Sequence, residues 1–432
     1  MMKKYNILVF PCGSEVGLEI NKSLKDIYFI QLFGGSSIDD HGRWEYENYI
    51  GNIPFINDEN FVDKLNEILE KNHIDFIFPA LDAVLLKLAE VRKLIKAEVL
   101  MSDNETIEIC RNKNKTYKYL TGCSFLPTFY SNADEVKEFP VFLKPAVGQG
   151  AKDVKRIDDY EQLVFELKER GTEQAICEYL PGEEYTVDCF TSQSGSLKFS
   201  SHRSRKRIRN GISVNSVLEK FDLRINEIAE TINSKFKLRG AWFFQVKLSK
   251  NNEYKLMEIG TRIAGTMCVQ RARGVNLPLL TVFDALGYDV VIKPQFNFVE
   301  TDRALINCYN INFKFDELYI DYDDTLIVHN KINLQAIALI YKCINNNIPI
   351  VLITKHLTDI FEELKDNKID SNLFKKIIQI KPKEHKCDYF APSENALFID
   401  DSFKERKEVI DKFGIKAIGI DMLEVFLNGV IM

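Results

Sequence analysis

Acidic side chains directly follow two short apolar segments in the C-terminal part of this 432-residue chain. Leu318–Ile320 leads into Asp321-Tyr322-Asp323-Asp324, and Ala396–Ile399 leads into Asp400-Asp401. A carboxylate at the end of a parallel strand lies at the sheet edge where α/β proteins bind ligands. Carboxylates at positions i and i+2 can act as the nucleophile and as the general acid/base of phosphoester cleavage. Asp321 would attack phosphorus, while Asp323 would protonate the leaving oxygen and then activate water.

A threonine and a lysine complete a site for phosphate. The apolar segment Ile350–Ile353 delivers Thr354, whose hydroxyl can hold a phosphoryl group. Lys386 can neutralise the phosphoryl charge, and Lys381 and Lys383 compete with it for that role. Carboxylates at one sheet edge are also the hard oxygen ligands that Mg²⁺ prefers, with Mn²⁺ as an alternative. The set predicts a metal-dependent phosphatase-type site.

In order and spacing these motifs resemble the haloacid-dehalogenase-like (HAD) phosphatase superfamily over residues 316–432. The resemblance implies a nucleophile at Asp321, an acid/base at Asp323, phosphate contacts from Thr354 and Lys386, and Mg²⁺ ligands at Asp321, Asp323, Asp400 and Asp401. The intervals from Asp321 to Thr354 and from Thr354 to Lys386 are only 33 and 32 residues. They leave no room for a large cap domain, so we expect an open Rossmann-like site.

A second set of residues, between positions 106 and 270, is typical of a binding site for a nucleoside triphosphate. Lys113 and Lys144 can each offer an ammonium group to phosphate oxygens. Small residues around Gly148 and Gly150 allow backbone N–H groups to close over a polyphosphate. Backbone groups of Glu178 to Leu180 can meet an adenine edge, and the Glu184 carboxylate can meet ribose hydroxyls.

The same region also offers groups for metal binding and phosphoryl transfer. Glu258 ends an apolar segment, where a rigid carboxylate can share Mg²⁺ with phosphate oxygens. Arg262 lies four residues further on, with a planar fork that suits a transferring phosphoryl group or an acyl phosphate.

Together these stretches resemble the ATP-grasp superfamily, in particular its carbamoyl-phosphate-synthetase-like carboxylate–amine ligases, over residues 1–300. The matching motifs are Asn112-Lys113, Phe142-Leu143-Lys144-Pro145, Glu178-Tyr179-Leu180-Pro181-Gly182-Glu183-Glu184 and Glu258-Ile259-Gly260-Thr261-Arg262. The resemblance implies ATP as co-substrate and Mg²⁺ on Glu258, with Gln245 as its partner. The family usually has Asn where this chain has Gly260, so one metal ligand is missing or supplied elsewhere.

A basic segment carries five cations in the seven residues from Arg203 to Arg209. One interpretation is a solvated hairpin tip. The functional interpretation is a lid whose arginines, Arg203 and Arg205 among them, hold the γ-phosphate and an anionic acceptor. An RNA-binding patch is disfavoured because no aromatic residues interleave with the cations.

The elements that must position these residues are short strands alternating with helices. Apolar segments such as Ile7–Phe10 and Phe76–Pro79 alternate with helical stretches, which predicts a parallel α/β unit over residues 1–105. Ala241–Leu248 and Tyr254–Ile259 predict an antiparallel pair within an α+β unit over residues 106–300. We therefore expect an α/β and α+β multidomain protein, with a linker at 301–315 and an α/β domain at 316–432.

Composition restricts the class of protein. The net charge is −6, of which −5 falls in residues 315–432, so a general nucleic-acid-binding surface is not expected. No apolar run is long enough to cross a membrane, and the N-terminal apolar stretch is too short for a signal peptide. The nine cysteines lack a Cys-x-x-Cys pair. We expect a cytoplasmic enzyme that acts on small molecules. A homo-oligomer is compatible with this sequence.

The leading hypothesis is a bifunctional enzyme. An ATP-dependent ligase would join a carboxylate to an amine through an acyl phosphate, and a phosphatase would act on a phosphoester among its substrates or products. A second hypothesis is a small-molecule kinase with an editing phosphatase. A third makes the C-terminal domain a docking module without catalytic activity.

Overall fold

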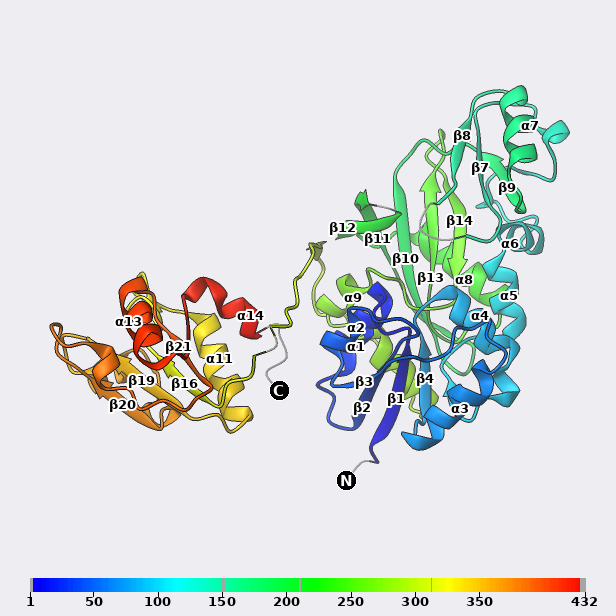
Figure 1. Cartoon of the computed structure of the whole chain (residues 1–432). Coiled ribbons are helices and arrows are strands. Elements are labelled where there is room, and N and C mark those ends of the chain that lie inside the picture. The colour runs from blue at the N-terminus through cyan, green and yellow to red at the C-terminus, as the bar shows by residue number, and fades with distance from the viewer. Residues whose placement is uncertain (1–2, 149–151, 210, 312, 428–432) are drawn as a thin grey trace. The chain divides into compact units, whose positions relative to one another are not determined.

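The computed structural model describes residues 3–148, 152–209, 211–311 and 313–427. The chain divides into two compact units, Met1–Ala304 and Leu305–Met432, which are described separately (Figure 1). The division falls inside the segment 301–315. No helix of the described residues is both long and apolar enough to cross a membrane.

The first unit begins with a five-stranded parallel sheet in the order β3-β2-β1-β4-β5. Its strands are β1 (Tyr5–Phe10), β2 (Ile30–Gly35), β3 (Asn48–Ile50), β4 (Phe76–Pro79) and β5 (Glu98–Val99). The accompanying helices are α1 (Glu15–Leu24), α2 (Gly42–Glu45), α3 (Phe61–Lys71), α4 (Asp82–Glu90) and the 3₁₀ turn η1 (Arg92–Leu94). The predicted parallel α/β arrangement is confirmed.

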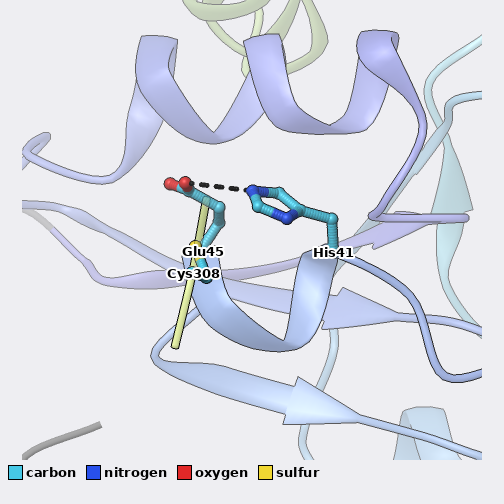
Figure 2. Close-up of side chains that lie close together, drawn as sticks. All are labelled: His41, Glu45 and Cys308. Atoms are coloured by element: carbon cyan, nitrogen blue, oxygen red, sulfur yellow. Dashed lines mark ion pairs between the residues drawn. The ribbon is translucent and has the colours of Figure 1, made fainter. Parts of the chain in front are cut away.

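Local chemistry fixes where α1 begins. The Ser14 side chain accepts a hydrogen bond from the Gly17 N–H at 3.0 Å and so caps the helix. A side chain at Gly17 would place its Cβ 2.4 Å from the Cys12 carbonyl oxygen, so only glycine allows this helix to pack against the end of β1. Nearby, the imidazole of His41 forms an ion pair with Glu45 at 3.6 Å across the short helix α2 (Figure 2).

Two antiparallel sheets complete the first unit, in the orders β6-β9-β7-β8 and β14-β13-β10-β11-β12-β15. The smaller sheet comprises β6 (Phe129–Tyr130), β7 (Val141–Pro145), β8 (Lys155–Ile157) and β9 (Gln174–Glu178). The larger comprises β10 (Glu184–Thr191), β11 (Leu197–Arg209), β12 (Ile212–Leu218), β13 (Gly240–Leu248), β14 (Tyr254–Gly260) and β15 (Glu300–Asp302). Their helices are α5 (Asn104–Arg111), α6 (Lys113–Tyr119), η2 (Ala133–Glu135), α7 (Tyr160–Glu169), α8 (Leu223–Lys235), α9 (Cys268–Ala272) and α10 (Leu277–Ala285). The predicted β13–β14 pair is confirmed.

The basic segment belongs to β11, which corrects the expectation of a lid at its first residues. Arg203 is paired with Thr186 of β10 on one side and with Leu218 of β12 on the other. A strand with hydrogen-bonded neighbours on both sides is a fixed part of its sheet. Only the residues towards Arg209 approach the end of the β11–β12 hairpin.

The second unit is built on a five-stranded parallel sheet in the order β20-β19-β16-β21-β22. The strands are β16 (Glu317–Ile320), β19 (Ile350–Thr354), β20 (Lys376–Gln379), β21 (Ala396–Ile399) and β22 (Lys416–Ile418), with a small hairpin of β17 (Ile327–Val328) and β18 (Lys331–Ile332). The helices are α11 (Leu334–Asn345), α12 (Ile360–Asp366), η3 (Ser371–Leu373), η4 (Lys386–Asp388), α13 (Phe403–Phe413), η5 (Ile420–Met422) and α14 (Leu423–Leu427). Within the described residues of this unit, the connections between sheet strands hold one or two short helices and that hairpin, and no inserted cap domain.

Candidate functional site

Two cavities of the first unit meet at a common wall. Their volumes are about 180 and 190 Å³. The wall between them is made by residues that line both: Lys113, Gly148, Arg205, Gly211, Gln245 and Glu258. The two cavities are therefore adjacent and share charged and amide side chains.

The second of these cavities combines an apolar interior with polar groups at its edges. Its apolar lining includes Phe142, Val154, Leu256 and Met257. The predicted ATP-binding residues that line it are Lys113, Lys144, Gly148, Glu178, Leu180 and Glu184. The predicted Gly150 lies outside the described residues. The apolar lining and the two lysines suit a nucleotide base and its phosphates, respectively.

Lys144 is held in place by a tyrosine that the sequence analysis missed. Its Nζ donates to the Tyr117 hydroxyl at 2.9 Å and lies 3.3 Å from the Met257 carbonyl oxygen. Tyr117 in turn donates to that carbonyl at 2.8 Å and is fully buried. Burial raises the pKa of Tyr117 well above its usual value, so the phenol stays a neutral donor. The sequence did contain one indication of this role: Tyr117 follows the predicted phosphate ligand Lys113 by about one helical turn on α6, which places both side chains on the same face of the helix.

Lys113 is the first residue of α6, where Asn112 caps the helix by accepting a hydrogen bond from the Lys115 N–H at 3.1 Å. The Nζ atom of Lys113 lies 3.7 Å from Glu258 Oε2. Burial lowers the pKa of Lys113, and the neighbouring cations Lys144 and Arg111 lower it further, while Glu258 opposes them. An anion placed between these cations would relieve their mutual repulsion.

Gln245 and Glu258 are directly opposite each other on β13 and β14. The Gln245 Oε1 atom accepts a hydrogen bond from Arg205 at 3.2 Å. The position of the missing family ligand is closed, because a Cβ on Gly260 would come within 2.3 Å of the Phe243 ring. The two oxygen-bearing side chains fit one Mg²⁺ shared with phosphate oxygens, and residue 260 cannot add a ligand.

Arg262 lies in the more charged cavity and is bound by Asp82, another residue that the sequence analysis missed. Its Nε and Nη2 atoms donate to the two Asp82 oxygens, both at 2.7 Å. Burial raises the pKa of Asp82, but the charge and hydrogen bonds of Arg262, together with the charges of Arg111 and Lys113, outweigh burial, so the pKa is lowered. Asp82 follows β4 at the carboxyl end of the parallel sheet, and that placement was the signal available in the sequence.

The two arginines predicted to bind phosphate are already paired with carboxylates. Arg203 donates to Asp188 at 2.9 and 3.4 Å, and both side chains are almost fully buried. Gln270 donates to the same carboxylate at 3.1 Å. Arg205 is hydrogen-bonded to Glu184, the predicted ribose ligand, and both of these residues line the second, more apolar cavity.

The second unit gathers three carboxylates and a lysine at the carboxyl ends of β16 and β21. One ligand oxygen from each of Asp321, Asp400 and Asp401 lies within 4.8 Å of the others. Lys386 Nζ lies 2.6 Å from both Asp321 and Asp400, whereas Lys381 and Lys383 are exposed. Burial raises the pKa of Asp321 and of Asp400, against the opposing charge of Lys386. A divalent cation among these oxygens would stabilise their charged forms.

The remaining predicted residues lie beside this cluster, together with a histidine that the sequence analysis did not single out. Thr354 is fully buried at the end of β19, and its hydroxyl donates to Asp323 at 3.3 Å. The Asp323 side chain is half exposed and also contacts His356, whose Nδ1 lies 2.8 Å from one carboxylate oxygen. His356 follows Thr354 by two residues, and its place beyond a buried strand was the only signal in the sequence.

Comparison with known proteins bears on the first unit. Residues 172–304 match a family model described as ATP-grasp in the biosynthetic pathway with Ter operon. No curated protein matches the chain. Among solved structures, biotin carboxylase from Campylobacter jejuni is 17% identical, with a TM-score of 0.56 over 68% of this chain and 73% of that one.

Two other structures are similar to the same degree. The N5-carboxyaminoimidazole synthetase from Staphylococcus aureus, solved with ADP, is 16% identical, with a TM-score of 0.55 over 66% of this chain and 78% of that one. An L-amino acid ligase from Bacillus licheniformis is 17% identical, with a TM-score of 0.53 over 66% and 75% of the two chains. These likenesses and the family match agree with the arrangement of the sheets in the first unit. The chain therefore contains an ATP-grasp domain.

Proposed function

We propose that the first unit is an ATP-dependent carboxylate–amine ligase. The observation that carries this proposal is the shared wall between the apolar and the charged cavity, which contains Lys113, Gln245 and Glu258. ATP bound in the apolar cavity would present its γ-phosphoryl group at that wall. A carboxylate in the charged cavity would then receive it, because positioning and charge stabilisation are the main requirements of phosphoryl transfer.

Each residue has a defined part in this reaction. Lys113 and Lys144 would bind the phosphates, and Glu258 with Gln245 would hold Mg²⁺, which supplies charge neutralisation when bound. The acceptor carboxylate oxygen would form a bond to the γ-phosphorus as ADP leaves. The amine would then attack the acyl carbon of the acyl phosphate, and inorganic phosphate would leave. Arg262, oriented by Asp82, would stabilise the negative charge on the acyl phosphate.

The related structures support a reaction of this class. One of them is named as an L-amino acid ligase and another as a carboxylase solved with an ATP analogue. The matched family is described as part of a biosynthetic pathway.

We further propose that the second unit is a HAD-type phosphatase. The supporting observation is that Asp321, Asp400 and Asp401 offer oxygens within 4.8 Å of one another, beside Lys386. This donor set fits Mg²⁺, which would neutralise phosphate charge when bound. Asp321 would form the aspartyl-phosphate, and Thr354 and Lys386 would contact the phosphoryl group. Its substrate would be a phosphoester among the reactants or products of the ligase.

The Asp321→Asn variant separates the two activities. Given MgATP, this variant should release ADP only when both the acid and the amine are present. ADP release that does not depend on the amine contradicts the ligase, and a phosphorylated acceptor accumulating without amine indicates a kinase instead. In the wild-type chain, Mg²⁺-dependent hydrolysis of p-nitrophenyl phosphate should occur and should disappear in Asp321→Asn. No hydrolysis by the wild type would indicate a docking module.

A further inference from the structure

His356 connects the half-exposed Asp323 to the body of the second unit. Its Nδ1 atom lies 2.8 and 3.0 Å from the two Asp323 oxygens, and its Nε2 atom lies 2.7 Å from the Thr358 hydroxyl. Because a carboxylate only accepts hydrogen bonds, Nδ1 carries the hydrogen and donates it to Asp323. The ring is therefore held from both nitrogens, with its donor directed at the proposed acid/base.

The backbone around His356 is fixed by further contacts. Its N–H donates to the Thr354 hydroxyl at 3.1 Å, and its carbonyl accepts from the Gln379 side chain at 2.9 Å. The imidazole packs edge-on against Tyr322, with ring centroids 5.2 Å apart. The imidazole is only 15% exposed, whereas the Asp323 side chain is 50% exposed. The histidine is thus the more buried partner of the two.

Asp323 needs such a partner because little else restrains it. It lies in the turn between β16 and β17, and the next residue, Asp324, has a left-handed backbone with φ of 52°. Among the described residues, the other side-chain hydrogen bond to the Asp323 carboxylate comes from Thr354, at a longer 3.3 Å. A proton donor must lie within hydrogen-bond reach of the leaving oxygen in order to assist its departure.

We propose that His356 is a positioning residue that aims Asp323 at the leaving oxygen of a phosphoester. This inference rests on the proposed phosphatase function. In the first step Asp321 forms a bond to phosphorus, the bond to the leaving oxygen breaks, and Asp323 gives that oxygen its proton. In the second step the Asp323 carboxylate takes a proton from water, whose oxygen displaces Asp321 as inorganic phosphate forms.

The test compares two leaving groups in the full-length chain with MgCl₂. p-Nitrophenolate leaves readily without a proton, whereas the alkoxide of β-glycerophosphate needs one. We expect His356→Ala to lower kcat/KM on β-glycerophosphate by about 10- to 100-fold, a part of what a general acid contributes. The ratio kcat/KM is the quantity compared because it reports the step in which the leaving oxygen departs, and not the later water step that both esters share. On p-nitrophenyl phosphate the loss should stay below about threefold. His356→Asn, whose amide can still donate to Asp323, should recover most of the lost rate.

A double-variant comparison tests that His356 acts through Asp323. In the Asp323→Asn background, His356→Ala should add little further loss, because interacting residues are non-additive. His73→Ala, at an exposed histidine of the first unit, is the matched control and should leave both rates unchanged. Equal losses on the two esters, or fully additive losses, overturn the inference alone. Absence of hydrolysis of either ester by the wild type overturns the phosphatase proposal and, with it, this role of His356.

Discussion

Arg262 and Asp82 are 180 residues apart in the sequence and form a bidentate ion pair, with both N–O distances at 2.7 Å. Asp82 begins α4 of the parallel α/β part, whereas Arg262 follows β14 of the large antiparallel sheet. The guanidinium also lies over the Phe243 ring, 5.5 Å from its centroid. The pair therefore joins two parts of the first unit at the wall of the charged cavity.

Removing the charge of Asp82 should weaken both folding and catalysis. Asp82→Asn leaves the largely buried Arg262 without a counter-charge, and we expect the free energy of unfolding to fall by about 2–4 kcal/mol. The rate of ADP release should fall as well, because Asp82 no longer orients the Arg262 guanidinium. Urea unfolding and an ADP assay measure the two effects. Asp63→Asn, at an exposed acidic residue in the first turn of α3, is the matched control and should change neither.

The same pair should make stability depend on pH. The pKa of Asp82 is lowered in the folded state, so its contribution is complete above its unfolded value of about 3.9. The contribution is lost as the pH falls through the folded value, where the carboxylate becomes protonated. The stability difference between wild type and Asp82→Asn should therefore be constant from pH 5 to 7 and shrink in strong acid. A difference that grows on acidification would contradict this assignment.

Tyr117 should matter for ATP binding more than for folding. Tyr117→Phe removes the hydroxyl that accepts from Lys144 but keeps the ring that fills the core. We expect the KM for ATP to rise by about tenfold, the equivalent of one hydrogen bond to a charged group. Tyr119→Phe, on the same helix but half-exposed, should leave the KM unchanged. A KM that is equal in the two variants would exclude a positioning role for the Tyr117 hydroxyl.

Gly260 should not tolerate a side chain. Gly260→Ala forces its Cβ against the Phe243 ring, and we expect a loss of about 1–3 kcal/mol in the free energy of unfolding. Gly260→Asn should be at least as destabilising and should not improve Mg²⁺ dependence, although it restores the usual family motif. Gly171→Ala, at a position with open space around the added carbon, is the control and should be neutral. Tighter Mg²⁺ binding in Gly260→Asn would contradict this account.

Lys386 should be required in the second unit, whereas its neighbour Lys383 should not. Lys386→Met leaves Asp321 and Asp400 without their shared cation, so phosphatase activity should fall by about 100-fold or more, comparable to losing one stabilising group in the transition state. Mg²⁺ should also raise the Tm of this variant more than that of the wild type, because only the metal can then neutralise the carboxylates. Lys383→Met should resemble the wild type in both measurements.

The sequence by itself determined the local elements and many of the residues at the cavities. Apolar segments followed by polar residues predict buried strands whose ends share an edge, and this holds for β16, β19 and β21 in the second unit. Motif order was sufficient to predict the ATP-grasp domain. Local patterns succeed there because strand formation and the polarity change at a strand end depend on neighbouring residues.

Tertiary structure alone decided which charges are already paired. Nothing near Arg203 in the sequence indicates that Asp188 and Gln270 bury it, nor does the sequence around Arg262 point to Asp82. The choice of Lys386 over Lys381 and Lys383, and the contact of His356 with Asp323, likewise arise where separate strands meet. Such pairings depend on distances between chain segments that no local pattern encodes, because each is fixed by the packing of whole sheets against their helices.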